Sequence, residues 1–125
     1  MGYKIEVRPE DAVIIETWDA HYNPQTDAPQ AAKEIIQLME AARRPTTVIV
    51  DMRAKALTFD DILLMAKSAS SKDAPSHHPM QRRRIIVTTS DIIAMAAEGL
   101  DNAVFGHIVV DIASSVEEAL EMARK

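Results

Sequence analysis

Apolar and polar positions alternate near the start of the chain, which is the pattern of a half-exposed β-strand. The alternation covers Tyr3–Val7, and a more apolar stretch, Val13–Trp18, follows after a short turn at Arg8–Ala12. Because this connection is so short, the two strands are expected to pair as an antiparallel hairpin.

After the hairpin, the apolar spacing switches between a helical period and short unbroken runs. Helices are predicted where apolar residues recur three and four positions apart, at Gln30–Arg43, Phe59–Ser70, Ser90–Gly99 and Val116–Arg124. Buried strands are predicted at Thr46–Val50, Arg84–Thr88 and His107–Asp111. The resulting order, ββαβαβαβα, predicts an α/β fold with a mixed, mostly parallel five-stranded sheet and helices on both faces.

The composition fits one globular domain over residues 1–125. A chain of 125 residues with 47% apolar positions can form a core without disulfides, and it contains no cysteine. It shows neither a signal-peptide pattern nor a run of about 20 apolar residues, so a cytoplasmic protein that avoids membranes is expected. A net charge of −5 argues against nucleic-acid binding, because an acidic domain is repelled by phosphate backbones.

Familiar catalytic and cofactor motifs are absent from the sequence. The chain has three glycines and lacks a P-loop, a G-x-G-x-x-G pattern and a G-x-S-x-G elbow. Glycine is needed wherever a backbone approaches a phosphate or a dinucleotide closely. The sequence therefore predicts a protein that binds and is not an enzyme, with no cofactor and no resident metal.

Two stretches carry a resemblance to a known family. They are "VIVDMRAKALTFDDILLMA" (Val48–Ala66) and "GHIVVDIASSVEEALEMA" (Gly106–Ala123). With the ββαβαβαβα order, they resemble the STAS superfamily, in particular its single-domain SpoIIAA-like branch of anti-sigma-factor antagonists. The resemblance implies a SpoIIAA-like fold and a regulatory module that binds a protein partner. Where switching members have Asp-Ser followed by Gly, this chain has Asp61 followed by Ile62 and Leu63, so the phosphorylatable serine is absent.

The acidic turn before the helix Phe59–Ser70 has two interpretations. Thr58 and Asp61 have the spacing of a capping box, in which each side chain accepts a backbone N–H of the other residue. Alternatively, the turn is a negative surface that docks a partner, formed by Asp51, Thr58, Asp60 and Asp61. Phosphorylation of Thr58 in place of the missing serine is a further alternative.

A rival hypothesis places a small ligand at the edge where the parallel strands end. In open α/β sheets, ligands gather beyond the carboxyl ends of the strands. Acids and hydroxyls suited to a divalent metal or a phosphate group are expected there at Asp19, His21, Asp51, Thr88, Ser90 and Asp111. Such a site would make binding, or even catalysis, a property of this edge. The same residue types also serve as ordinary helix N-caps.

The helix around "DIIAMAAEGL" is apolar on most of its circumference. A surface helix normally has one apolar stripe, so Ile93, Met95 and Ala97 are predicted to form an interface, most simply in a homodimer. The alternative is that this helix forms the wall of a pocket for an apolar, lipid-like ligand.

The basic run Arg82–Arg84 leads into a predicted strand, where side chains point alternately to opposite faces. Arg83 is therefore expected to point away from Arg82 and Arg84. These arginines either protect the edge of a buried strand or form a small anion-binding patch.

Overall fold

The computed structural model describes residues 2–125, and the order of its helices and strands is the predicted one. The strands are β1 (Tyr3–Arg8), β2 (Val13–Trp18), β3 (Thr46–Asp51), β4 (Gln81–Val87) and β5 (Asp111–Ala113). The α-helices are α1 (Asp27–Ala42), α2 (Phe59–Ala69), α3 (Asp91–Glu98) and α4 (Val116–Ala123). Over the described residues, no helix combines the length and the apolar character needed to cross a bilayer.

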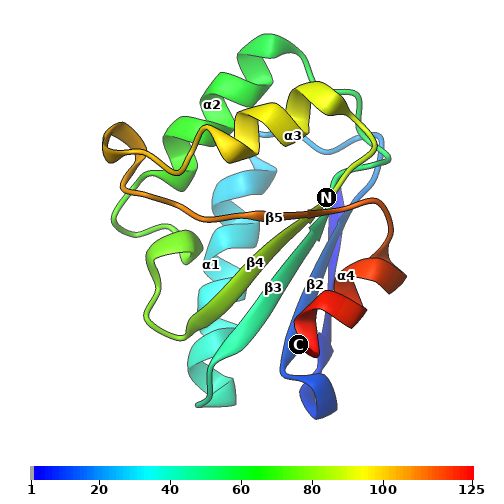
Figure 1. The fold of residues 1–125 in the computed structure, drawn as a ribbon, viewed down its shortest axis with the longest axis vertical. Coiled ribbons are helices and arrows are strands. Elements are labelled where there is room, and N and C mark those ends of the chain that lie inside the picture. Colours follow the sequence, from blue (N-terminus) through cyan, green and yellow to red (C-terminus); the bar gives the residue numbers. More distant parts are fainter. Residues whose placement is uncertain (1) are drawn as a thin grey trace.

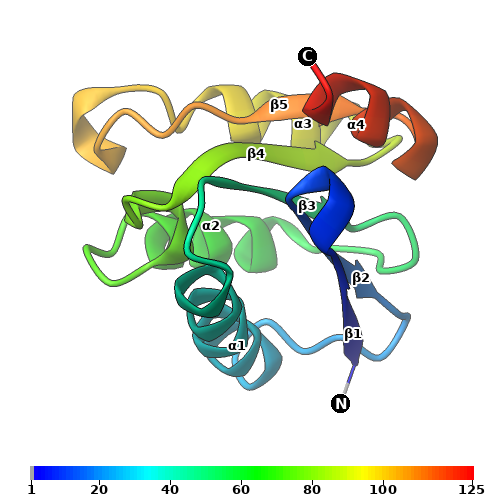
Figure 2. The same cartoon turned by 90° about the horizontal axis from the view of Figure 1, so that it is seen from below.

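The five strands form one mixed sheet in the order β1-β2-β3-β4-β5. β1 pairs antiparallel with β2, and all other neighbours pair in parallel, as the sequence predicts. α1 and α4 lie on opposite faces of this sheet (Figures 1 and 2). Because successive parallel strands are neighbours and their crossovers share one hand, α2 and α3 fall on the same face as α1.

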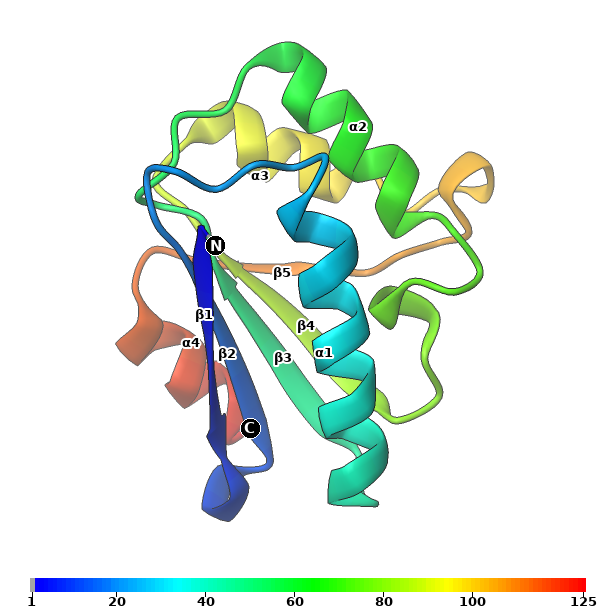
Figure 3. The same ribbon diagram turned by 180° about the vertical axis from the view of Figure 1, so that it is seen from behind.

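The two faces of the sheet form two separate apolar clusters. On β3, Val48 and Val50 belong to the cluster under α1, whereas Ile49 belongs to the cluster under α4. All six residues of β3 are buried, because helices cover this central strand on both sides. The face under α1 is the one that carries the site described below (Figure 3).

The last strand begins later than the sequence pattern indicates. The predicted strand His107–Asp111 is wrong over most of its length, because pairing with β4 begins only at Asp111. His107 has a left-handed backbone conformation (φ 55°), and the residues that follow cross the end of α3 without a strand partner. Apolar residues in this connection, such as Ile108, are buried against the helices and so imitate the pattern of a strand.

The side chain of Ile49 anchors the cluster under α4. It is fully buried (0% exposed), so Ile49→Ala should lower the free energy of unfolding by about 2–5 kcal/mol, the usual cost of such a cavity. Urea unfolding followed by circular dichroism measures this change. Val109→Ala, at a position that is 67% exposed, serves as the control and should shift stability by no more than about 0.5 kcal/mol. Equal losses from the two variants would contradict the assigned core.

Candidate functional site

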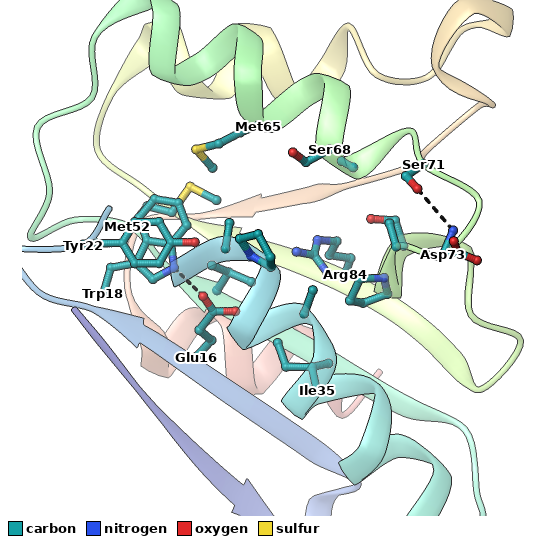
Figure 4. A pocket seen from close by; sticks show the side chains of 18 residues that line it. Glu16, Trp18, Tyr22, Ile35, Met52, Met65, Ser68, Ser71, Asp73 and Arg84 are labelled. Atoms are coloured by element: carbon teal, nitrogen blue, oxygen red, sulfur yellow. Dashed lines mark hydrogen bonds between the residues drawn. The ribbon is translucent and has the colours of Figure 1, made fainter. Parts of the chain in front are cut away.

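A cavity of about 380 Å³ lies between α1, α2 and the adjoining face of the sheet. Figure 4 shows Trp18, Tyr22, Met52 and Met65 gathered at one end and Arg84 reaching into the space between the helices. Exposed polar residues on and after the end of α2 line its other end, namely Ser68, Ser71 and Asp73. Most of the lining is apolar, and only a few side chains bring charge inside.

An aromatic pair forms one wall of the cavity. The rings of Trp18 and Tyr22 are stacked, with centroids 3.8 Å apart and planes 8° from parallel. Gly2 keeps this arrangement possible, since a Cβ at that position would lie 2.3 Å from the Cα atom of Tyr22. The aromatic wall therefore depends on the close passage of the N-terminal segment. Burial, aided by the charges of Glu16 and Asp27, raises the pKa of Tyr22, so its ring enters the cavity as a neutral phenol.

Glu16 brings a carboxyl group into this apolar face of the sheet. Side chains two apart on a strand share a face, so Glu16 lies on the same side of β2 as Ile14 and Trp18. It is only 4% exposed, and its Oε2 accepts a hydrogen bond of 2.6 Å from Trp18 Nε1. Burial raises the pKa of Glu16, and the charge of Glu34 adds to this, against the opposing effects of Trp18 and Arg84.

Arg84 supplies a cationic group on the neighbouring strand β4. Its Nη1 donates to the neutral Oε1 of Gln81 at 3.3 Å, and in the described part of the chain it forms no ion pair with Glu16 or any other acid. Among residues 2–125, no fully buried side-chain nitrogen or oxygen lacks a hydrogen-bond partner. The N–H groups of Arg84 that have no partner are therefore accessible to solvent. Because Arg84 lines both cavities, these groups face cavity space.

A bulge decides which arginine enters the cavity. The pairing of β3 with β4 shifts between Thr46 and Thr47, so that Arg82 is the extra residue on β4. Arg82 and Arg83 therefore both reach the α4 side, where they donate to carbonyl oxygens at the end of α4. The expected alternation is wrong at this point, and Arg84 alone of the three turns to the cavity.

A second, apolar cavity of about 100 Å³ lies beneath α2 and α3. It shares Met52, Met65 and Arg84 with the larger cavity, so the guanidinium lies where the two spaces adjoin. Ile93 and Ala97 line this second cavity. This placement corresponds to the alternative in which the helix forms the wall of an apolar pocket.

The three residues predicted as an interface do not share a surface. Ala97 is 4% exposed and Ile93 is packed against the core, whereas Met95 is 71% exposed. The expectation that Ile93 and Ala97 lie on an outer face is therefore wrong. These two residues are four positions apart, so they share one face of the helix, and that face is turned toward the sheet. An interface on α3 would instead use Ile92 and Met95.

The four residues predicted as a partner surface are engaged in different local structures. Thr58 and Asp61 form the predicted capping box, with Thr58 Oγ1 accepting from the Asp61 N–H at 3.1 Å and Asp61 Oδ2 accepting from the Thr58 N–H at 3.0 Å. Asp51 is buried and accepts two hydrogen bonds from the Arg53 side chain. Burial opposes ionisation of Asp51, but the bonds and charge of Arg53 outweigh it and lower its pKa. Asp60 is exposed.

The predicted ligand edge does not come together as one site. Asp19 accepts from the N–H of His21, Thr88 Oγ1 accepts from the N–H of Ser90, and the Ser90 hydroxyl caps α3. Over the residues that the structure describes, no three His, Cys, Asp or Glu side chains are grouped for a metal ion.

Asp111 in particular is placed elsewhere than predicted. It begins β5 instead of ending the strand, pairs in register with Ile85 and forms an ion pair with Arg83. It therefore lies away from the carboxyl ends of β3 and β4. This correction follows from the later start of the last strand.

Glu16→Gln should gain stability relative to the wild type as the pH rises. The folded pKa of Glu16 is raised, so the stability that its proton contributes is present below the unfolded pKa, near 4.5, and is lost as pH rises through the folded pKa. Glutamine is neutral at every pH and still offers an oxygen to Trp18 Nε1. Urea unfolding at about pH 4.5 and about pH 7.5 measures the change in the difference between the two proteins.

The control is Glu98→Gln, at an exposed position on α3. Its difference from the wild type should change by less than about 0.5 kcal/mol between the two pH values. A Glu16→Gln difference that is the same at both pH values would contradict the assigned environment of Glu16.

Comparison with known proteins found no match for this chain. The chain matches no protein-family model, and neither curated proteins nor solved structures give a significant match. The cavity and its charged groups are therefore the observations on which a function has to be argued.

Proposed function

We propose that this protein is a non-catalytic module that binds a small, mostly apolar molecule in the cavity between α1, α2 and the sheet. The observation that carries the proposal is the cavity itself, about 380 Å³ in volume, with Arg84 and Glu16 inside a mostly apolar lining and exposed polar residues at one end. Ligand pockets are typically about 300–1,000 Å³ in volume and combine apolar walls with a few convergent polar groups.

The packing around α2 supports this assignment. Protein interiors are normally as dense as organic crystals, and space left beside apolar side chains forfeits their contacts. No residue of α2 is buried; Met65 packs against the core, whereas Ala66 and Ala69 line the cavities without belonging to the core cluster. A molecule in this space would add contacts to these α2 side chains.

Alanines account for much of the open space. Ala28 and Ala32 on α1, Ala69 on α2 and Ala74 beyond it all line the larger cavity. A larger side chain at any of these positions would fill part of the volume. The small residues thus shape a pocket opposite the aromatic wall.

A larger side chain in the cavity should weaken the binding of an apolar ligand. Ala32→Phe is expected to weaken the affinity for N-phenyl-naphthylamine, a neutral apolar dye, by at least about tenfold, because the new ring occupies the ligand's space. Energy transfer from Trp18 to the dye reports occupancy, since the chain has a single tryptophan and it lines the cavity.

The matched control is Gln37→Phe, an exposed position on the same helix. It should leave the dye affinity within about twofold of wild type. If Ala32→Phe and Gln37→Phe bind the dye equally, or if the wild type shows no saturable signal, this site is not the binding site.

A second candidate function is favoured by the outer surface of α2 and α3. Large apolar side chains are exposed there on adjoining helices, and we call them the outer patch: Phe59, Leu63, Ile92 and Met95. Such exposed apolar groups are typical of protein contacts. We propose that this patch, with the exposed Asp60 beside it, docks a second protein chain, in keeping with the SpoIIAA-like resemblance and with a homodimer.

Removing the outer patch should prevent self-association. If the protein forms a homodimer through it, Met95→Asp will sediment as a monomer at a concentration where the wild type has twice the mass, because a desolvated carboxylate opposes the contact. Val104→Asp, which changes an exposed apolar residue outside the patch, should leave the dimer intact. A wild type that stays monomeric throughout would contradict the homodimer.

A further inference from the structure

We propose that the molecule bound in the larger cavity is a monocarboxylic acid with an apolar body, its carboxylate on the Arg84 guanidinium and its body against the stacked Trp18 and Tyr22 rings. This inference rests on the proposed binding function and adds the chemical class of the ligand. The charge of the cavity lining, its hydrogen-bond donors and its apolar walls support this ligand class.

The charge of Arg84 is left without a protein counter-ion. An arginine stays protonated in proteins and has five N–H donors, of which one is used on the neutral side chain of Gln81. Holding a cation among apolar side chains is costly unless an anion compensates it. Carboxylates and phosphates both form two parallel hydrogen bonds with a planar guanidinium, and a carboxylate carries the single negative charge that balances one arginine.

Glu16 does not remove this positive charge. No ion pair joins Glu16 to Arg84, and Glu16 Oε2 already accepts the Trp18 N–H. Burial raises the pKa of Glu16, so the ionised form that could neutralise Arg84 is disfavoured. In the buried part of the cavity Arg84 is thus the cation that a single ligand carboxylate can pair with, while Asp73 lies at the exposed end.

The titratable groups that act on Glu16 or lie near it come from β1, the segment after β2, α1 and β4. Glu34 on α1 and Arg84 on β4 act on its charge, Tyr3 on β1 is held neutral with a pKa of about 12, and Tyr22 is neutral as well. Arg84 is the one cation in this group. Ionised Glu16 would compete with a ligand anion for Arg84, so acid affinity should fall as pH rises.

The apolar body follows from what surrounds the two charged groups. Met52 and Met65 lie near the aromatic wall, and the second cavity on the far side of Arg84 is lined mostly by aliphatic side chains. A second carboxylate on the ligand would enter one of these apolar regions unpaired, at a high desolvation cost, or would meet the like charge of Asp73 at the polar end of the cavity. A monoacid avoids both costs.

Displacement of N-phenyl-naphthylamine by two molecules of equal chain length tests the proposal. Decanoate should displace the dye from the wild type at a concentration at least about tenfold lower than decanol does, because only decanoate has a charge for Arg84. Arg84→Gln should remove this preference, so that decanoate and decanol displace the dye at concentrations within about twofold of each other. The control Arg53→Gln, which breaks the pair with Asp51, should keep it.

Two further measurements separate the acid-binding site from a merely structural role. The preference for decanoate over decanol should decline in the wild type as rising pH ionises Glu16, whose pKa is raised by burial, and stay level in Glu16→Gln. Naphthoate compared with decanoate shows whether the body is aromatic or a chain, and tighter binding of either acid supports the shared carboxylate. The wild-type comparison of acid with alcohol needs no variant, so a misfolded Arg84→Gln would leave the test intact.

The outcomes distinguish the failure of the carboxylate proposal from the failure of the apolar pocket itself. Equal displacement by decanol and decanoate in the wild type would overturn the carboxylate and leave the apolar pocket standing. Absence of dye binding and of displacement by either molecule would overturn the pocket as well. A preference for decanoate that survives in Arg84→Gln would move the anion site to another residue.

Discussion

The two faces of the sheet are packed unequally, and the rest of this structure follows from that difference. Under α4, aliphatic side chains from β2, β3 and β4 meet Ala119, Leu120 and Ala123 in a closed cluster. Under the other helices, α1 contributes Ala31, Ile35 and Met39 to the core, whereas α2 contributes no buried residue. The face under α1 holds the larger buried cluster, but α2 adds no buried residue to it, so the space for a second molecule lies beside α2.

The fold was largely predictable because its signals are local and repeated. Unbroken β-branched runs identified β3, helical spacing identified α1, and the capping box at Thr58 and Asp61 was visible as a sequence pattern before any coordinates. The predicted start of β5 was wrong because burial of Ile108 against the helices produces the same apolar pattern as burial in a sheet. Strand pairing depends on partners that are distant in the sequence, and hydrophobicity alone does not encode them.

The site was much less predictable, for two physical reasons. A cavity is defined by side chains that are too small to fill it, and alanines such as Ala32 and Ala69 look like ordinary helix formers. The separation of Arg84 from Arg82 depends on a bulge opposite Thr46 and Thr47, which turns Arg82 to the α4 side, whereas Arg84 keeps the regular alternation with Ile86. Glu16 did carry a signal, because its parity with Ile14 and Trp18 places a carboxylate on an inward-facing position of the strand.

The treatment of charge elsewhere in the protein shows why Arg84 stands apart. Asp51 is paired with Arg53, Asp111 is paired with Arg83, and Arg82 satisfies a carbonyl oxygen at the end of α4. Each of these groups is partly withdrawn from water, and each is matched with an opposite charge or a helix terminus. Arg84 has only an amide oxygen as its acceptor and no ion pair with Glu16, whose pKa is raised by burial. Arg53 and Arg83 are each paired with an aspartate, whereas Arg84 keeps an electrostatic requirement that a bound anion would satisfy.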